Sequence, residues 1–290
     1  MSGKYNATAA QDMAVRISKP HRFNSDRVFD IVNYVLAGLL FLIVIYPLIF
    51  VVSASFSSPE ALIAGKVWFW PVDVGLEGYK AVFEYSKVWF GYLNSIFYAV
   101  FGSAISLFMT IIAAYPLSRK DFYGRNVLMF LFTFTMLFNA GLIPTFLVVR
   151  DLGIINTRWA LLLPGAISVY NLIITMNYFR SNIPGELMEA AQIDGCNDFK
   201  FLARIVLPLS MPIIAIIALY SIVGQWNAYF DAMIYLKDAK MFPLQLVLRE
   251  ILILNKSDEL LNMNLASDSA RQNLEELLKY ALIVVSTVPL

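Results

Sequence analysis

Few residues in this chain of 290 could perform covalent chemistry. It has one histidine, His21, and one cysteine, Cys196, whereas protein zinc sites usually take three or four such ligands. A single cysteine also excludes an internal disulfide. No Gly-x-x-x-x-Gly-Lys-Ser/Thr phosphate loop occurs, since Gly65-Lys66 is followed by Val67 and lacks the earlier glycine. The sequence therefore predicts no catalytic residue, no metal site and no cofactor bound by this chain.

Uncharged polar and aromatic side chains within long apolar stretches are candidates for binding. Amides offer donors and acceptors to sugar hydroxyls, and aromatic faces cover the apolar side of a sugar ring. We predict a pathway suited to a neutral sugar, with the candidates Asn139, Asn171, Gln225, Trp226, Asn227 and Tyr229. A structural alternative remains open for each residue. The amides could bond between helices instead, and the aromatic side chains could lie at a membrane interface.

The composition indicates a membrane protein. The chain is 59% hydrophobic and 15% charged, against about 45 to 50% apolar and about 25% charged in soluble domains. Its net charge of +1 gives no basic surface for nucleic acid. Five stretches without Asp, Glu, Lys, Arg or His are long enough to cross a bilayer: Ile31 to Ser53, Leu93 to Leu117, Val127 to Val149, Trp159 to Phe179 and Leu209 to Phe230. A sixth begins near Leu277 and is expected to be incomplete at Leu290.

Basic residues set the expected orientation of these stretches. Lysines and arginines gather before the first stretch and in the loop after the second, as in Arg22, Arg27, Arg119 and Lys120, and such clusters favour the cytoplasmic side. We therefore expect residues 1–28 to be a cytoplasmic segment and 29–290 to be the membrane domain. The five complete stretches lack ionisable groups, which argues against a transporter driven by protons or sodium.

The loop from Ser181 to Pro212 has the pattern of helix, turn and helix. Asn182 can cap the first helix, and Asp194-Gly195 supplies a left-handed stop. The second helix is expected to start near Asn197 and to end before Pro208. A shallow apolar face that could dock into a groove of another protein is formed by Leu187, Ala190, Ala191 and Ile193.

The spacing within this loop resembles the EAA loop of ABC importer permeases. The matching positions are Glu189-Ala190-Ala191, Gly195, Ile205 and Leu207-Pro208. Further segments resemble the carbohydrate-uptake branch of this family: Trp70-Pro71 with Tyr79, Asn94-Ser95, Ala113 to Arg119, Gly141 to Pro144, Leu152 to Thr157, and Trp226-Asn227. Cys196 departs from the pattern, where a small alanine is more usual.

The resemblance implies an all-α membrane protein with the six transmembrane helices of the type I importer permease fold, the sixth incomplete here. It implies a non-catalytic permease subunit of the bacterial cytoplasmic membrane, with its amino terminus inside, surrounded by lipid. The implied partners are a second permease, two ATPase subunits that bind ATP and Mg, an extracytoplasmic solute-binding protein and a sugar.

In such a subunit the cytoplasmic coupling loop, residues 181–208, contacts the ATPase. The residues that the resemblance assigns to this contact are Glu189, Ala190, Ala191, Asp194, Gly195, Ile205, Leu207 and Pro208. Two alternatives are an importer permease for a solute other than a sugar and a secondary transporter.

Overall fold

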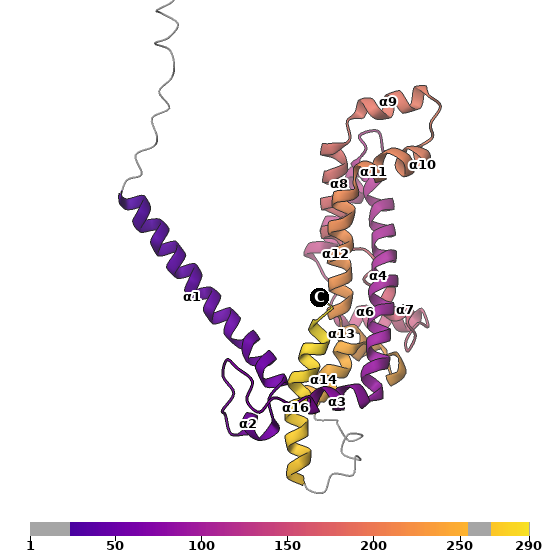
Figure 1. Cartoon of the computed structure of the whole chain (residues 1–290). Coiled ribbons are helices and arrows are strands. Elements are labelled where there is room, and N and C mark those ends of the chain that lie inside the picture. The colour runs from indigo at the N-terminus through magenta and orange to yellow at the C-terminus, as the bar shows by residue number, and fades with distance from the viewer. Residues whose placement is uncertain (1–23, 255–267, 290) are drawn as a thin grey trace, which may run out of the picture. The chain divides into compact units, whose positions relative to one another are not determined.

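The structure is a computed structural model that describes residues 24–254 and 268–289 (Figure 1). All regular secondary structure in these two ranges is helical, which confirms the predicted all-α class. The chain divides into two units, Met1–Phe50 and Val51–Leu290.

The first helix is apolar on every side. Helix α1, Asn24–Ser55, contains a candidate span of 30 residues, Asp26–Ser55, in which an 18-residue window has a mean hydropathy of 3.0. A helix needs about 20 apolar residues to cross a bilayer, so α1 is long enough and apolar enough to do so. This agrees with the stretch predicted from Ile31 to Ser53.

Three helices form the centre of the second unit. Helix α4, Ser86–Ser118, packs against α8, Val169–Asn182, and α12, Met211–Asn227. The side chain of Gln225 lies against α4 at Gly102, where an added Cβ would be only 2.8 Å from Gln225 Cδ. Gly102 therefore leaves room for the Gln225 side chain, which would have to shift if a Cβ were added there.

Two of the predicted stretches are divided into separate helices in the structure. The stretch Val127 to Val149 forms α5, Arg125–Leu137, and α6, Leu142–Asp151, with an angle of 117° between them. Gly141 has a φ of +86° at this break, and its N–H donates to Asn139 Oδ1 at 2.8 Å. The stretch Trp159 to Phe179 is likewise divided into α7, Trp159–Leu162, and α8.

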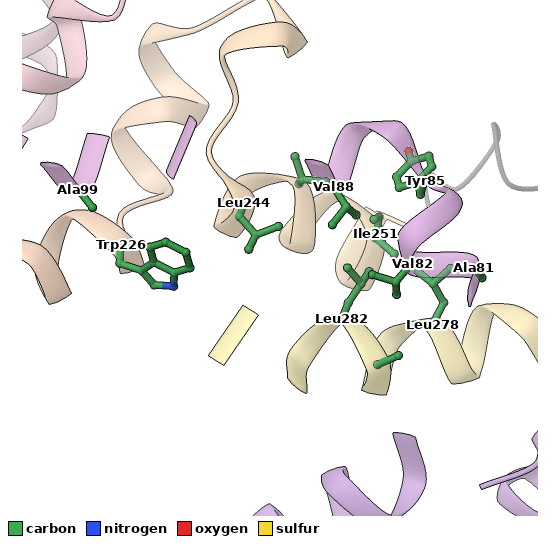
Figure 2. Close-up of a cluster of buried hydrophobic side chains, with 12 residues drawn as sticks. Ala81, Val82, Tyr85, Val88, Ala99, Trp226, Leu244, Ile251, Leu278 and Leu282 are labelled. Carbon is green, nitrogen blue, oxygen red and sulfur yellow. The ribbon is translucent and has the colours of Figure 1, made fainter. Parts of the chain in front are cut away.

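The second unit also contains several helices outside these stretches. They are α2 (Pro59–Ile63), α3 (Glu77–Glu84), α13 (Phe230–Tyr235), the 3-10 turn η2 (Ala239–Met241), α14 (Leu244–Leu254) and α16 (Asp268–Thr287). Figure 2 shows Val82 of α3, Ile251 of α14 and Leu282 of α16 in one apolar cluster. This cluster joins α3, α14 and α16 to one another.

Length and apolar composition identify two spans among the described residues, α1 and α4. The number rises to four if each bent pair of helices crosses as one span. One such pair is α5 with α6. The other consists of residues 198–209 followed, at an angle of 82°, by α12.

Candidate functional site: the coupling loop and a polar hollow

The first helix of the coupling loop, α9, runs from Gly185 to Ile193. It ends as predicted, because Gly195 has a φ of +72° and Cys196 N–H donates to Ala191 O at 2.8 Å. The predicted cap is wrong: Pro184 holds the cap position, and Asn182 instead closes α8 by donating from Nδ2 to Tyr178 O at 3.1 Å.

The two alanines of the EAA pattern face different surroundings. Ala191 is buried in a cluster with Phe179 and Phe201. Ala190 is exposed, as are Leu187 and Ile193, and Ile193 is 87% exposed. Ala191 therefore holds α9 against the neighbouring helices of the second unit. The other three predicted face residues are available to a partner.

The second arm of the loop, residues 198–209, is one helical path of changing pitch. It consists of α10 (Asp198–Phe201), a π-helical turn (Leu202–Val206) and α11 (Leu207–Leu209). It starts beside Asn197 as predicted, and Asn197 caps it, since Asn197 Oδ1 accepts from Lys200 N–H at 2.9 Å. The predicted end before Pro208 is wrong, because the helical path continues through Pro208, the second residue of α11, to Leu209.

The second arm leads directly into α12. The chain bends by 82° at Ser210 and continues as α12 from Met211. Phe201 and Val206 of the arm are buried with Leu172 and Ile213 of the helices α8 and α12. The arm is therefore joined to the start of α12 both by the chain and by this packing.

Arg119 joins this loop to the C-terminal end of α4. Its guanidinium pairs with the carboxylates of Asp121 and Asp198, and its Nε donates to Asp121 Oδ1 at 2.9 Å. It also lies 6.0 Å from the ring centre of Tyr115. The hydrogen bonds from Arg119 lower the pKa of Asp121, and those to Asp121 and Asp198 raise the pKa of Arg119.

A polar hollow of about 450 Å³ lies among the central helices. It is lined by Ser106 of α4, by Gly165, Ser168, Tyr170 and Asn171 at and before α8, and by Tyr220, Ser221, Gly224 and Gln225 of α12. A smaller cavity of about 90 Å³ shares Gly165, Gly224 and Gln225 with it and adds Asp231, the one charged residue that lines either space. Its lining thus combines hydroxyl, amide and aromatic groups, the group types that contact sugar hydroxyls and ring faces.

The hollow contains two of the six predicted pathway residues, Asn171 and Gln225. Trp226 is buried, and its Nε1 donates to Ser286 O at 3.1 Å. Asn227 Nδ2 donates to Val223 O of its own helix at 2.9 Å, while Arg249 lies 6.0 Å from the ring centre of Tyr229. Asn139 lies at the break between α5 and α6.

Sequence reasoning missed the hydroxyl-bearing residues of the hollow, namely Ser106, Ser168, Tyr220 and Ser221. Ser221, Gly224 and Gln225 are spaced i, i+3 and i+4, so they share one face of α12. Trp226 is one residue further and points to another face. This periodicity could have identified the Ser221 face from the sequence.

Comparison with known proteins identifies membrane components of transport systems. Residues 106–236 match the family described as binding-protein-dependent transport system inner membrane component. The chain is 43% identical over 264 residues to the polygalacturonan/rhamnogalacturonan transport system permease protein YtcP of Bacillus subtilis, covering 91% of each chain. It is 40% identical to protein LplC of Bacillus subtilis, covering 93% of this chain and 90% of the relative.

A solved structure is also similar. It belongs to a bacterial ABC transporter involved in the import of the acidic polysaccharide alginate. The matched chain superimposes with a TM-score of 0.83 at 38% sequence identity, covering 92% of this chain and 94% of that one. The family match over residues 106–236 includes both the loop 181–208 and the residues that line the hollow.

Proposed function

Because the chain belongs to the family of binding-protein-dependent inner membrane transport components, we propose that it is a permease subunit of an ATP-driven importer for a sugar or oligosaccharide. The observation that carries this proposal is the position of α12. Its inner end continues from the coupling loop through the bend at Ser210, and its middle supplies Ser221 and Gln225 to the polar hollow.

The coupling step follows from this connection. The exposed face of Leu187, Ala190 and Ile193 on α9 offers an apolar contact to a groove of an ATPase subunit. Movement of the loop on ATP binding would shift the second arm and hence α12. The side chains of Ser221 and Gln225 would then change position against Ser106 and Asn171, which opens or closes the hollow.

The remaining subunits complete the importer. Tyr170 and Tyr220 at the hollow are both more than half exposed, so a second permease can cover them and contribute the other side of the pathway. Two ATPase subunits would bind ATP and Mg on the cytoplasmic side, and an external solute-binding protein would deliver the sugar. Residues 1–28 and the coupling loop 181–208 are then cytoplasmic, and 29–290 form the permease domain.

The relatives favour a second candidate within the same class, an acidic oligosaccharide. YtcP is named for polygalacturonan and rhamnogalacturonan, and the solved importer for alginate. The hydroxyl and amide groups of the hollow suit neutral and acidic sugar rings alike. Asp231 in the adjoining cavity favours the neutral sugar, because its carboxylate repels a uronate but not a neutral ring.

Uptake by the reconstituted importer tests the proposal. The complete importer in liposomes, with its own binding protein outside and ATP inside, is assayed with trigalacturonate, its neutral methyl ester, and arabinotriose. We expect uptake of at least one of these that requires the binding protein and is lost when the phosphate-loop lysine of the ATPase is replaced. Uptake that survives this replacement and collapses with a proton or sodium ionophore would show a secondary transporter instead.

A further inference from the structure

The start of the second arm is held to α4 by charge. The later part of the arm is anchored by the buried side chains of Phe201 and Val206. At its start, Phe199 points outward and is 84% exposed. The residue beside it, Asp198, pairs with Nη1 of Arg119, which lies immediately after α4.

Open space lies on both sides of this ion pair, while further along the arm Phe201 and Val206 share an apolar cluster with Ala114 and Leu117 of α4. A cavity of about 660 Å³ between α9 and the inner ends of α4 and α8 is lined by Arg119, Glu189 and Phe201, among others. A second cavity of about 440 Å³ is lined by Arg119, Asp198 and Phe199 together with Pro116 and Phe122. Arg119 lines both cavities, so its side chain lies where apolar packing is incomplete.

The guanidinium is well placed to act as a link. The Arg119 side chain is only 19% exposed, whereas the side chains of Asp121 and Asp198 are 65% and 60% exposed. The ring of Tyr115, one turn earlier on α4, lies under the guanidinium, and its hydroxyl accepts from Nη1 at 3.4 Å. The planar fork of an arginine can serve two carboxylates at once in a fixed direction.

We propose that Arg119 is a positioning residue that ties the second arm to α4 through Asp198, so that movement of the coupling loop reaches α4 as well as α12. This inference rests on the proposed function and adds a second mechanical connection to it. α12 receives the movement through the covalent bend at Ser210. α4, which also supplies Ser106 to the hollow, receives it through the ion pair at the start of the arm in addition to the apolar cluster.

The two carboxylates on Arg119 provide a matched test. Asp198→Asn removes the charge that joins the loop to α4, whereas Asp121→Asn removes a charge only two residues from Arg119 in the chain. Asp198→Glu keeps the carboxylate and serves as the conservative variant. Both aspartates are exposed, so none of these changes removes a buried side chain. The measurements are amide hydrogen exchange over residues 198–206 in the assembled importer and the ratio of ATPase activity with and without the binding protein and the three sugars named above.

We expect Asp198→Asn to speed exchange in residues 198–206 and to lower the stimulation ratio about threefold or more, while Asp121→Asn and Asp198→Glu stay near wild type. Equal effects of the two asparagine variants, unchanged exchange in Asp198→Asn, or faster exchange with an unchanged ratio would each overturn the tether. If the wild-type importer shows no stimulation with any of the sugars, the proposed function fails, and the exchange measurement still decides whether Asp198 holds the arm.

Discussion

The indole of Trp226 on α12 is tied to the backbone of Ser286 on α16, with Nε1 donating to the carbonyl oxygen at 3.1 Å. Trp226 also packs edge to face with Tyr92, at 5.4 Å between ring centres. Its one polar group is thus used inside the protein. The residue links the central helices to the α3, α14 and α16 cluster.

Trp226→Phe is therefore expected to lower stability more than sugar affinity. The change leaves a buried carbonyl without this donor, which costs about 1 to 3 kcal/mol. Thermal unfolding of the assembled importer should show a lower midpoint, and the sugar concentration for half-maximal uptake should stay within about twofold of wild type. A large rise in that concentration with unchanged thermal stability would show instead that Trp226 contacts the sugar.

Gln225→Ala is expected to weaken sugar recognition. Gln225 lines both the hollow and the smaller cavity, and one hydrogen bond contributes about 0.5 to 1.5 kcal/mol, or about 2- to 12-fold in affinity. The half-saturating sugar concentration should rise by that factor. Asn227→Ala is the control, because Asn227 bonds to Val223 of its own helix and lies outside the hollow. Equal effects of the two substitutions would remove Gln225 from the proposed site.

The sequence predicted only some of the pathway residues, because it does not specify which face of each helix points into the hollow. Residue types indicated that amides within apolar stretches bind polar solutes, and this selected Asn171 and Gln225. It also selected Trp226, because composition does not say which face of α12 meets α16. The partners of Trp226 and Gln225 are more than 50 residues away in the chain, at Ser286 and Gly102, and no local pattern specifies them.

Local backbone chemistry was more predictable. The left-handed turn at Gly195 and the Asn197 cap follow from neighbouring residues alone, and both are present. The break at Gly141 lies beside Asn139 and Pro144, residue types that interrupt helices, but the mean hydropathy of the stretch gives no signal of it. The continuation of the second arm through Pro208 depends on the π-helical turn before it, which has no evident sequence signature.

Asp231 gives a pH dependence with a defined sign. It follows α12, outside the candidate spans, and burial raises the pKa of its carboxyl above the ordinary 3.8. Ionising it therefore destabilises the folded state at pH values above its raised pKa, and this penalty disappears below pH 3.8, where folded and unfolded forms are both protonated. Asp231→Asn should raise the unfolding midpoint at pH 8, and the gain should shrink as the pH falls toward 4. A gain that is constant with pH would show that the charge is not responsible.

Labelling of Cys196 tests the proposed orientation. The coupling loop carries this half-buried thiol, the one cysteine of the chain. In intact cells a maleimide that does not cross membranes should leave Cys196 unmodified and should label it after permeabilisation. Lys237→Cys in a Cys196→Ser background is the control for the outer side and should react in intact cells. Modification of Cys196 in intact cells would reverse the assigned topology.

Gly195→Val measures the central claim most directly, that the coupling loop transmits ATP-driven movement to the pathway. A Cβ at Gly195 meets nothing within 4 Å, so the substitution acts through the backbone, whose φ of +72° costs a branched residue about 1 to 3 kcal/mol. Gly185→Val is the matched control, because a Cβ there also meets open space and its φ lies outside the left-handed region. With equal assembly of the importer, the account predicts that Gly195→Val loses binding-protein-stimulated ATP hydrolysis and sugar uptake while Gly185→Val keeps both. Wild-type hydrolysis and uptake in Gly195→Val would contradict it.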